Sequence, residues 1–160
     1  VRMGHGHAPE HVTLWSMDDD LVIGGDQMLA TISPNLGVYP TEPGADTVGD
    51  WLESCTRLAK FARPEQLVLP GHKLPYRGLP TRLRQLETNQ GAALERILAA
   101  LRESPRSAVG CFEVLYRRHI GKAEFGLALA EAVGHINHLH ATGRVWPAGK
   151  TPDGAALWGA

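Results

Sequence analysis

The sequence lacks the features that mark secreted, membrane-spanning and strongly charged proteins. Its two cysteines, Cys55 and Cys111, are far apart and give neither a disulfide framework nor a zinc knuckle. No apolar run approaches the ~20 residues that cross a bilayer, and the first residues show no charged-then-apolar export signal. The formal net charge is only −1. We therefore expect a soluble, cytoplasmic protein with reduced thiols and no membrane partner.

Charge and composition change along the chain. Residues 1–81 carry six Lys and Arg against ten Asp and Glu, whereas residues 82–160 carry ten against seven. A chain of 160 residues with 43% hydrophobic content can bury a core, as one domain or as two small ones. The shift near residue 80 predicts two domains, residues 1–80 and residues 81–160.

The first part alternates short apolar runs with turn-forming residues, which is typical of an α/β layer. The runs Val12–Trp15 and Leu21–Gly24 are separated by Ser and Asp residues and predict adjacent strands. Residues 31–44 contain three prolines and two glycines and predict an irregular loop. Apolar side chains then recur at helical spacing from Val48 to Ala62, after a possible cap at Asp46 or Thr47, and Gln66–Leu69 predicts another strand.

The second part is mainly helical. Leucines keep helical phase from Leu83 to Leu101, Ser107 can begin a second helix, and a third helix is predicted from about Ala123 to Thr142, with Gly143 as its C-terminal cap. Two short apolar strands then flank the turn signal Pro152-Asp153-Gly154. Three helices followed by a β-hairpin are the outline of a winged-helix domain.

Three potential metal ligands stand where predicted strands end. His7, Asp26 and His72 each follow an apolar or glycine-rich stretch and open a loop, so the layers of an α/β fold can bring them to one sheet edge. A carboxylate can bridge two cations, and neutral imidazoles complete each cation's shell without excess negative charge. The pattern predicts a metal site, with the loop 31–44 beside it.

These residues resemble the second half of the metallo-β-lactamase superfamily. Gly6-His7-Ala8-Pro9-Glu10-His11 is similar to the family's glycine–histidine turn, and Gly25-Asp26-Gln27 is similar to its bridging aspartate. The family's first motif, His-x-His-x-Asp-His, is missing. The resemblance implies the C-terminal half of an αββα sandwich followed by a mostly helical winged-helix domain, as in the branch related to glyoxalase II and to a eukaryotic endoribonuclease. The chain looks like the C-terminal portion of a longer enzyme.

The resemblance also implies roles for these side chains. In the complete enzyme two divalent metals, expected to be zinc, would be held, with His7 completing the first shell, Asp26 bridging and His72 completing the second. His11 would support the site through hydrogen bonds. We expect this chain alone to be close to inactive and at most singly metallated. Its exposed strands would be covered by the missing N-terminal half or by self-association.

Three functions remain open at this stage. The first is hydrolysis of a small carbonyl or thioester substrate, the second is cleavage of single-stranded RNA, and the third is a non-catalytic winged-helix interaction module. Residues 123–143 contain no Lys or Arg, so we expect no sequence-specific DNA binding. RNA contact would have to use six other cations: Arg77, Arg82, Arg84, Arg117, Arg118 and Lys122. The nearly neutral charge favours the small substrate.

A second group of histidines lies in the predicted third helix. His135, His138 and His140 are close in sequence, but only His135 and His138 share a helical face, and no carboxylate accompanies them. We therefore interpret the group as a polar helix surface and not as a metal site.

Overall fold

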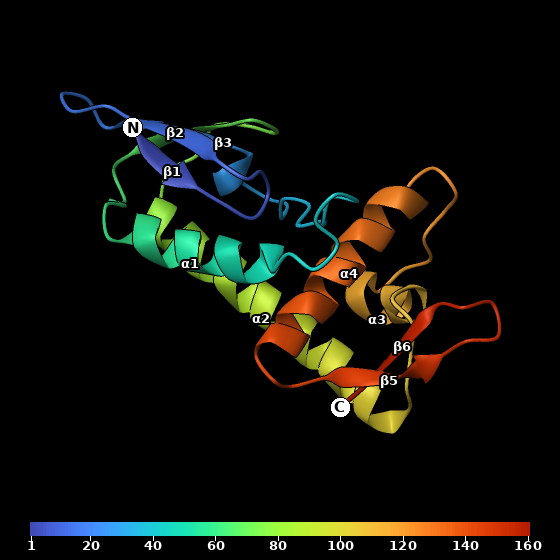
Figure 1. Ribbon diagram of the computed structural model, residues 1–160. Helices are drawn as coiled ribbons and strands as arrows, with labels where there is room; N and C mark the ends of the chain where they lie inside the picture. The colour runs from blue at the N-terminus through green and yellow to red at the C-terminus, as the bar shows by residue number, and fades with distance from the viewer. The chain divides into compact units, whose positions relative to one another are not determined.

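The computed structural model describes all residues from Val1 to Ala160 and shows a mixed α+β fold with four α-helices and two β-sheets (Figure 1). Contacts divide the chain into two compact units, residues 1–35 with 49–89 and residues 36–48 with 90–160. The predicted boundary between residues 80 and 81 falls inside the long helix α2 (Leu79–Glu103) and stays a prediction. None of the helices has the length and apolar character needed to cross a membrane.

A four-stranded sheet forms the base of the first unit. Its strands lie in chain order: β1 (Arg2–Gly4), β2 (His11–Trp15), β3 (Leu21–Gly25) and β4 (Leu67–Pro70). β2 pairs antiparallel with both β1 and β3, whereas β3 and β4 are parallel. The predicted turn between β2 and β3 is confirmed, because the hydroxyl of Ser16 accepts hydrogen bonds from the backbone N–H groups of Asp18 and Asp19 at 3.3 and 3.0 Å. The position of His7 implied a strand before it, but the bounds of β1 were not predicted, since three residues give no alternating pattern.

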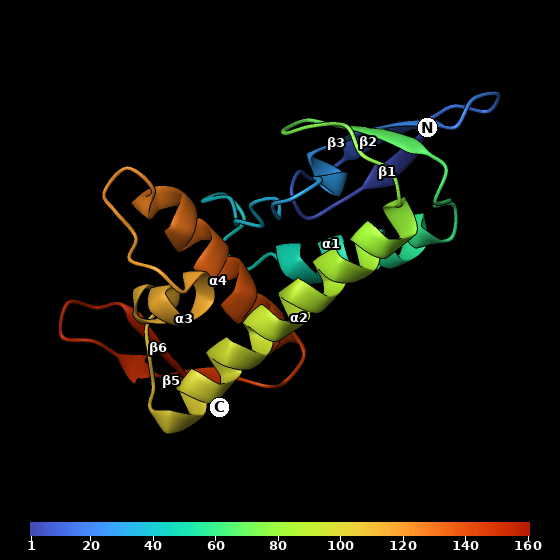
Figure 2. The same cartoon turned by 180° about the vertical axis from the view of Figure 1, so that it is seen from behind.

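Helices cover one face of this sheet and leave the other open. α1 (Thr47–Ala59) and the first part of α2 lie on the same side of the sheet in both views (Figures 1 and 2). Thr13, Val22 and Val68 are fully buried, whereas Val12, Leu14 and Ile23 are 51%, 45% and 45% exposed. Neighbouring side chains on a strand point to opposite faces, so the exposed residues mark an open apolar face. The assignment of this unit to half of an αββα sandwich stays a prediction.

The second unit contains the predicted succession of helices and a hairpin. After α2 come η2 (Val109–Cys111), α3 (Phe112–Tyr116), α4 (Phe125–Ala141), β5 (Trp146–Lys150) and β6 (Ala156–Gly159). The hydroxyl of Ser107 accepts a hydrogen bond from the N–H of Gly110 in η2 at 3.2 Å, whereas the α-helix predicted to begin at Ser107 begins only at Phe112. Gly143 has φ 67° and its N–H donates to the carbonyl of His140 at 2.9 Å, so the predicted C-terminal cap is confirmed. The winged-helix assignment stays a prediction.

The irregular segment before α1 is shared between the two units. We call residues 36–48 the strap, because they belong to the second unit although they lie between two parts of the first. The N–H of Val38 in the strap donates to the carbonyl of Ala130 in α4 at 3.2 Å. The loop 31–44 is irregular as predicted, but only its first residues belong to the unit that carries His7, Asp26 and His72.

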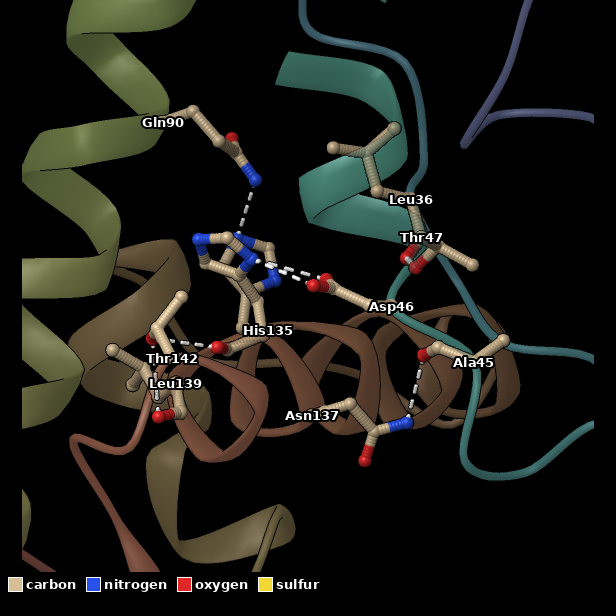
Figure 3. A network of polar contacts seen from close by, with 10 residues as sticks. Leu36, Ala45, Asp46, Thr47, Gln90, His135, Asn137, Leu139 and Thr142 are labelled. Carbon is tan, nitrogen blue, oxygen red and sulfur yellow. Dashed lines mark hydrogen bonds and ion pairs between the residues drawn. The ribbon is translucent and has the colours of Figure 1, made fainter. Parts of the chain in front are cut away.

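His135 of α4 does not lie on a polar helix surface, so the prediction was wrong for this residue, whereas His140 is exposed. His135 is 1% exposed, and its Nε2 lies 2.7 Å from Nε2 of Gln90 on α2 (Figure 3). Nδ1 of His138 lies 3.0 and 3.1 Å from the two carboxylate oxygens of Asp46. A carboxylate therefore does accompany the group. It could not be seen in the local sequence because Asp46 and His138 are 92 positions apart.

Candidate functional site

Three loops with candidate ligands leave the same end of the four-stranded sheet. β3 and β4 are parallel, and β1 runs in the same direction as β3 because both are antiparallel to β2. His7 follows β1, Asp26 begins the 3₁₀ turn η1 (Asp26–Met28) after β3, and His72 follows β4. The carboxyl ends of these strands meet at one sheet edge, where α/β proteins place their sites.

The imidazoles of His7 and His72 converge on the carboxylate of Asp26. Nε2 of His7 lies 3.3 Å from Oδ2 of Asp26, and Nε2 of His72 lies 3.4 Å from the same oxygen. The side chains of His7 and Asp26 are 26% and 21% exposed, whereas that of His72 is 65% exposed. The predicted convergence is confirmed. Their role as metal ligands stays a prediction.

A backbone carbonyl fixes the orientation of the His7 ring. Nδ1 of His7 lies 2.8 Å from the carbonyl oxygen of Asn35. A carbonyl can only accept, so Nδ1 carries a proton, and in the neutral form of the ring Nε2 is left with a lone pair. That lone pair faces Asp26, which is also an acceptor. Two acceptors repel one another unless a proton or a cation lies between them, so this geometry suits a metal ligand whose other nitrogen is held by a carbonyl.

His11 lies beside this group at the start of β2. Its ring centroid is 5.8 Å from that of His7. Burial lowers the pKa of His11, the neighbouring His7 lowers it further, and Asp26 opposes both effects. This lowered pKa favours the neutral form of the His11 ring. Its predicted support through hydrogen bonds stays a prediction.

Two glycines make room for the site, and neither was recognised from the sequence. Gly25 has φ 51° and ψ −143°, and a Cβ atom there would lie 2.4 Å from Nε2 of His11. A Cβ atom at Gly71 would lie 2.2 Å from Oδ1 of Asp26. The N–H of Gly71 donates to the carbonyl of Gly25 at 2.9 Å, which joins the loops after β3 and β4. A side chain at either glycine would displace His11 or Asp26.

Helix α1 anchors the loop that carries His7. The hydroxyl of Ser54 accepts a hydrogen bond from the N–H of His5 at 2.9 Å. The guanidinium of Arg57 donates to the carbonyl of Met3 at 2.9 Å. Both bonds involve backbone groups at the end of β1, so they hold the loop and not one side chain.

Arg82 holds the segment that follows Asp26 through hydrogen bonds to backbone carbonyls. Its Nε donates to the carbonyl of Leu29 at 2.7 Å, and its Nη2 donates to the carbonyl of Ile32 at 2.9 Å. The hydroxyl of Tyr76 donates to the carbonyl of Met28 at 3.1 Å. Arg82 was predicted as an RNA contact, and much of its hydrogen-bonding capacity is used inside the protein.

The other cations predicted to contact RNA are spread over both units. Arg77 and Arg84 lie in the first unit, whereas Arg117, Arg118 and Lys122 lie in the second. Arg118 forms two bonds to the carboxylate of Glu124, at 2.7 and 2.8 Å. An open hollow of about 460 Å³ in the second unit is lined by Arg96, Glu113, Val114, Arg117, Arg118 and His119. RNA binding by these residues stays a prediction.

The donors at the sheet edge suit a divalent transition metal in kind but not in number. Two imidazole nitrogens and a carboxylate are ligands that zinc, iron and manganese accept. As the side chains are placed, no group of three or more His, Cys, Asp or Glu residues is arranged to hold a metal ion. Further ligands would be needed to close the shell.

Several known proteins are similar to this chain in sequence and structure. Residues 94–152 match the metallo-beta-lactamase-like, C-terminal domain family. A beta-lactamase domain protein from Burkholderia ambifaria is 37% identical, with a TM-score of 0.89 over 99% of this chain and 46% of that chain. The chain is homologous to portions of metallo-beta-lactamase family proteins.

Two further relatives agree with this result. A metallo-beta-lactamase family protein from Thermus thermophilus is 26% identical, with a TM-score of 0.82, and the match covers 98% of this chain and 47% of that chain. The protein named "Probable metallo-hydrolase YqjP" from Bacillus subtilis (strain 168) is 26% identical over 139 residues, which are 85% of this chain and 43% of the relative. The chain therefore spans about half the length of the relatives it matches, and its mixed α+β fold corresponds to their C-terminal half.

Proposed function

We propose that this chain contributes His7, Asp26 and His72 to the metal site of a hydrolase. The observation that carries the proposal is the convergence of both imidazoles on one oxygen of Asp26, at 3.3 and 3.4 Å. The relation to proteins named as a metallo-hydrolase and as metallo-beta-lactamase family members supports it.

Each residue has a distinct part in this proposal. His7, Asp26 and His72 would hold the metal, with two neutral imidazoles and one carboxylate as donors that suit a divalent transition metal such as zinc. Asn35 holds the proton of His7 on Nδ1, which keeps Nε2 free to bind. When bound, a divalent metal lowers the pKa of a coordinated water and supplies hydroxide at neutral pH.

The proposed substrate is a small molecule with a carbonyl or thioester group. The formal net charge of −1 gives no general attraction for a polyanion. Arg82 is bonded to two carbonyls and Arg118 to Glu124, so these cations are partly used within the protein. The hollow beside Arg117 and Arg118 favours the second candidate, cleavage of single-stranded RNA.

Zinc affinity tests the ligand assignment. It is measured by competition with a chromophoric chelator for the wild type and for His7→Ala, Asp26→Asn and His140→Ala. We expect His7→Ala and Asp26→Asn to weaken binding at least tenfold, because the remaining donors are too few. His140→Ala is the matched control, because this exposed histidine lies in the second unit, where its ring bonds to the carbonyl of Val145. Equal affinity in all four proteins would refute the assignment.

Substrate class is tested in a chimaera in which this chain replaces the matching 46% of the Burkholderia ambifaria relative. We expect thioester hydrolysis that falls by a factor of about 10³ or more in Asp26→Asn, because a lost bridging ligand removes the means of activating water. Faster cleavage of single-stranded RNA than of thioesters would favour the ribonuclease candidate. Zinc binding without either activity would favour the non-catalytic module.

A further inference from the structure

The open hollow of the second unit, with a volume of about 460 Å³, is lined mainly by cationic side chains. Its lining residues all belong to this unit and are Arg96, Glu113, Val114, Arg117, Arg118 and His119. Arginines therefore outnumber carboxylates around one small space. A hollow lined by charges of one sign raises the local concentration of ligands of the opposite sign, so this hollow attracts anions.

The guanidinium group of Arg96 is held in place by the protein itself. Its Nε donates to the carbonyl of Val114 at 3.0 Å, and its Nη2 donates to the carbonyl of Leu115 at 3.2 Å. A guanidinium group has more N–H groups than these two bonds use, so donors remain for a ligand. Because the group is already fixed, less side-chain entropy is lost when an anion binds to it.

Arg117 has a backbone conformation that is unusual for a residue with a side chain. It is the C-terminal cap of α3, with φ 57° and ψ 27°, and its N–H donates to the carbonyl of Glu113 at 2.9 Å. Glycine or asparagine is favoured at such a left-handed cap, because Cβ crowds the following carbonyl oxygen. Apart from glycines, only Lys73 and Arg117 have a positive φ in this protein. Strained residues of this kind gather at ligand sites, so the cap gives a second reason to assign a ligand to the hollow.

The size and lining of the hollow favour one phosphate group on a small molecule. Its volume of about 460 Å³ lies within the range of small-molecule sites and leaves room beyond a single phosphate. Guanidinium groups match phosphate oxygens in geometry and charge, and Val114 offers apolar contact to the rest of the ligand. Single-stranded RNA would need a longer track of cations and aromatic rings for base stacking, whereas no Phe, Tyr or Trp lines the hollow. Arg118 is also partly neutralised by its ion pair with Glu124.

We propose that the hollow binds the phosphate group of a small phosphorylated molecule, with Arg96 and Arg117 as its main contacts. A ring nitrogen of His119 supplies a further hydrogen bond to a phosphate oxygen. Glu113 opposes binding, because its carboxylate repels a phosphate. All of these residues lie in one unit, and the site needs no metal, so the proposal does not depend on the proposed function.

The test is an NMR titration of the chain with phenyl phosphate, in which the backbone amide shifts are recorded. Phenol and a single-stranded RNA without a terminal phosphate are titrated for comparison. Arg117→Asn removes a proposed contact and keeps a residue that tolerates the left-handed conformation. Glu113→Gln removes the opposing charge. Arg102→Gln is the matched control, because this exposed arginine in the last turn of α2 does not line the hollow.

We expect phenyl phosphate to give saturable shift changes at the residues that line the hollow, and phenol to give none. Arg117→Asn should weaken binding by about fivefold or more, because a charge-assisted hydrogen bond is lost. The urea midpoint of this variant should stay the same or rise, because the strain at the cap is relieved. Glu113→Gln should strengthen binding by about two- to threefold, as expected for one exposed charge. Arg102→Gln should leave the affinity unchanged.

Three results would overturn the proposal. Shift changes that do not saturate would show that no site exists, and equal weakening in Arg102→Gln and Arg117→Asn would show only a general attraction of charges. Tighter binding of the RNA than of phenyl phosphate would assign the hollow to an RNA backbone. If Arg117→Asn does not fold, Glu113→Gln decides the outcome, and an affinity for phenyl phosphate equal to that of the wild type then refutes the proposal.

Discussion

Acid should destabilise this protein through His135. The residue is 1% exposed, and Nδ1 lies 2.8 Å from the carbonyl of Glu131, so the proton of the neutral ring is on Nδ1. Nε2 then accepts a hydrogen bond from the side-chain amide of Gln90 at 2.7 Å. A second proton on the ring would place a charge in this buried environment and break the bond from Gln90 unless its amide turned over.

The size of the effect follows from the change in pKa on folding. Burial lowers the pKa of His135 from 6.5 to about 4, and the hydrogen bond to the carbonyl of Glu131 opposes this only in part. The unfolded chain therefore takes up the proton at higher pH than the folded chain. The buried neutral ring of His135 therefore contributes fully to the free energy of unfolding above pH 6.5. This contribution is lost as the pH falls from 6.5 to about 4. At pH 4.5 the loss is roughly 2–3 kcal/mol, since each unit of pKa difference is about 1.4 kcal/mol.

The assay is urea unfolding at pH 7.5 and pH 4.5 for the wild type, His135→Gln and His140→Gln. Carboxylates titrate in all three proteins, so their effects cancel in the comparison. We expect His135→Gln to lose roughly 2–3 kcal/mol less stability on acidification than the other two. Equal losses in all three proteins, or an NMR titration midpoint of the His135 ring near 6.5, would refute the reasoning.

Two further predictions concern the glycine beside His11 and the open face of the sheet. Gly25→Ala should lower the free energy of unfolding by roughly 1–3 kcal/mol in urea, because only glycine adopts its backbone angles without strain. Gly91 lies in open space within α2, so Gly91→Ala should leave the free energy of unfolding unchanged or raise it by up to about 1 kcal/mol. Equal changes in the free energy of unfolding for Gly25→Ala and Gly91→Ala would contradict this prediction. Leu14→Lys should reduce self-association in analytical ultracentrifugation, because Leu14 lies on the open apolar face. Leu127→Lys on α4 should leave self-association unchanged. A wild type that is monomeric would contradict the prediction.

Local patterns in the sequence were enough to predict most of the elements and the candidate ligands. Alternation, turn residues and helical spacing act within a few neighbouring residues, so the hairpin around Ser16 and the end of α4 at Gly143 could be predicted. The ligands His7, Asp26 and His72 could be selected because each one follows a strand. The carboxyl ends of parallel strands lie at the same edge of the sheet, whatever chain segment connects the strands.

Contacts between distant residues could not be predicted in the same way. His135 was interpreted as exposed because its partner Gln90 is 45 positions away on another helix. The role of Asn35 is carried by a backbone carbonyl, which every residue has, so no residue type indicates it. A glycine is needed at position 134 because the strap packs against α4 there. Such features depend on tertiary structure, which overrides local pattern.

X-ray absorption at the zinc edge of the zinc-loaded chain tests the central claim most directly. If His7, Asp26 and His72 are ligands, the first shell contains only nitrogen and oxygen at about 2.0–2.2 Å, with the signature of imidazole rings. Asp26→Asn should change this spectrum, and His140→Ala should not. A sulfur shell at about 2.3 Å would instead implicate Cys55 or Cys111, and a spectrum unaffected by Asp26→Asn would contradict the claim.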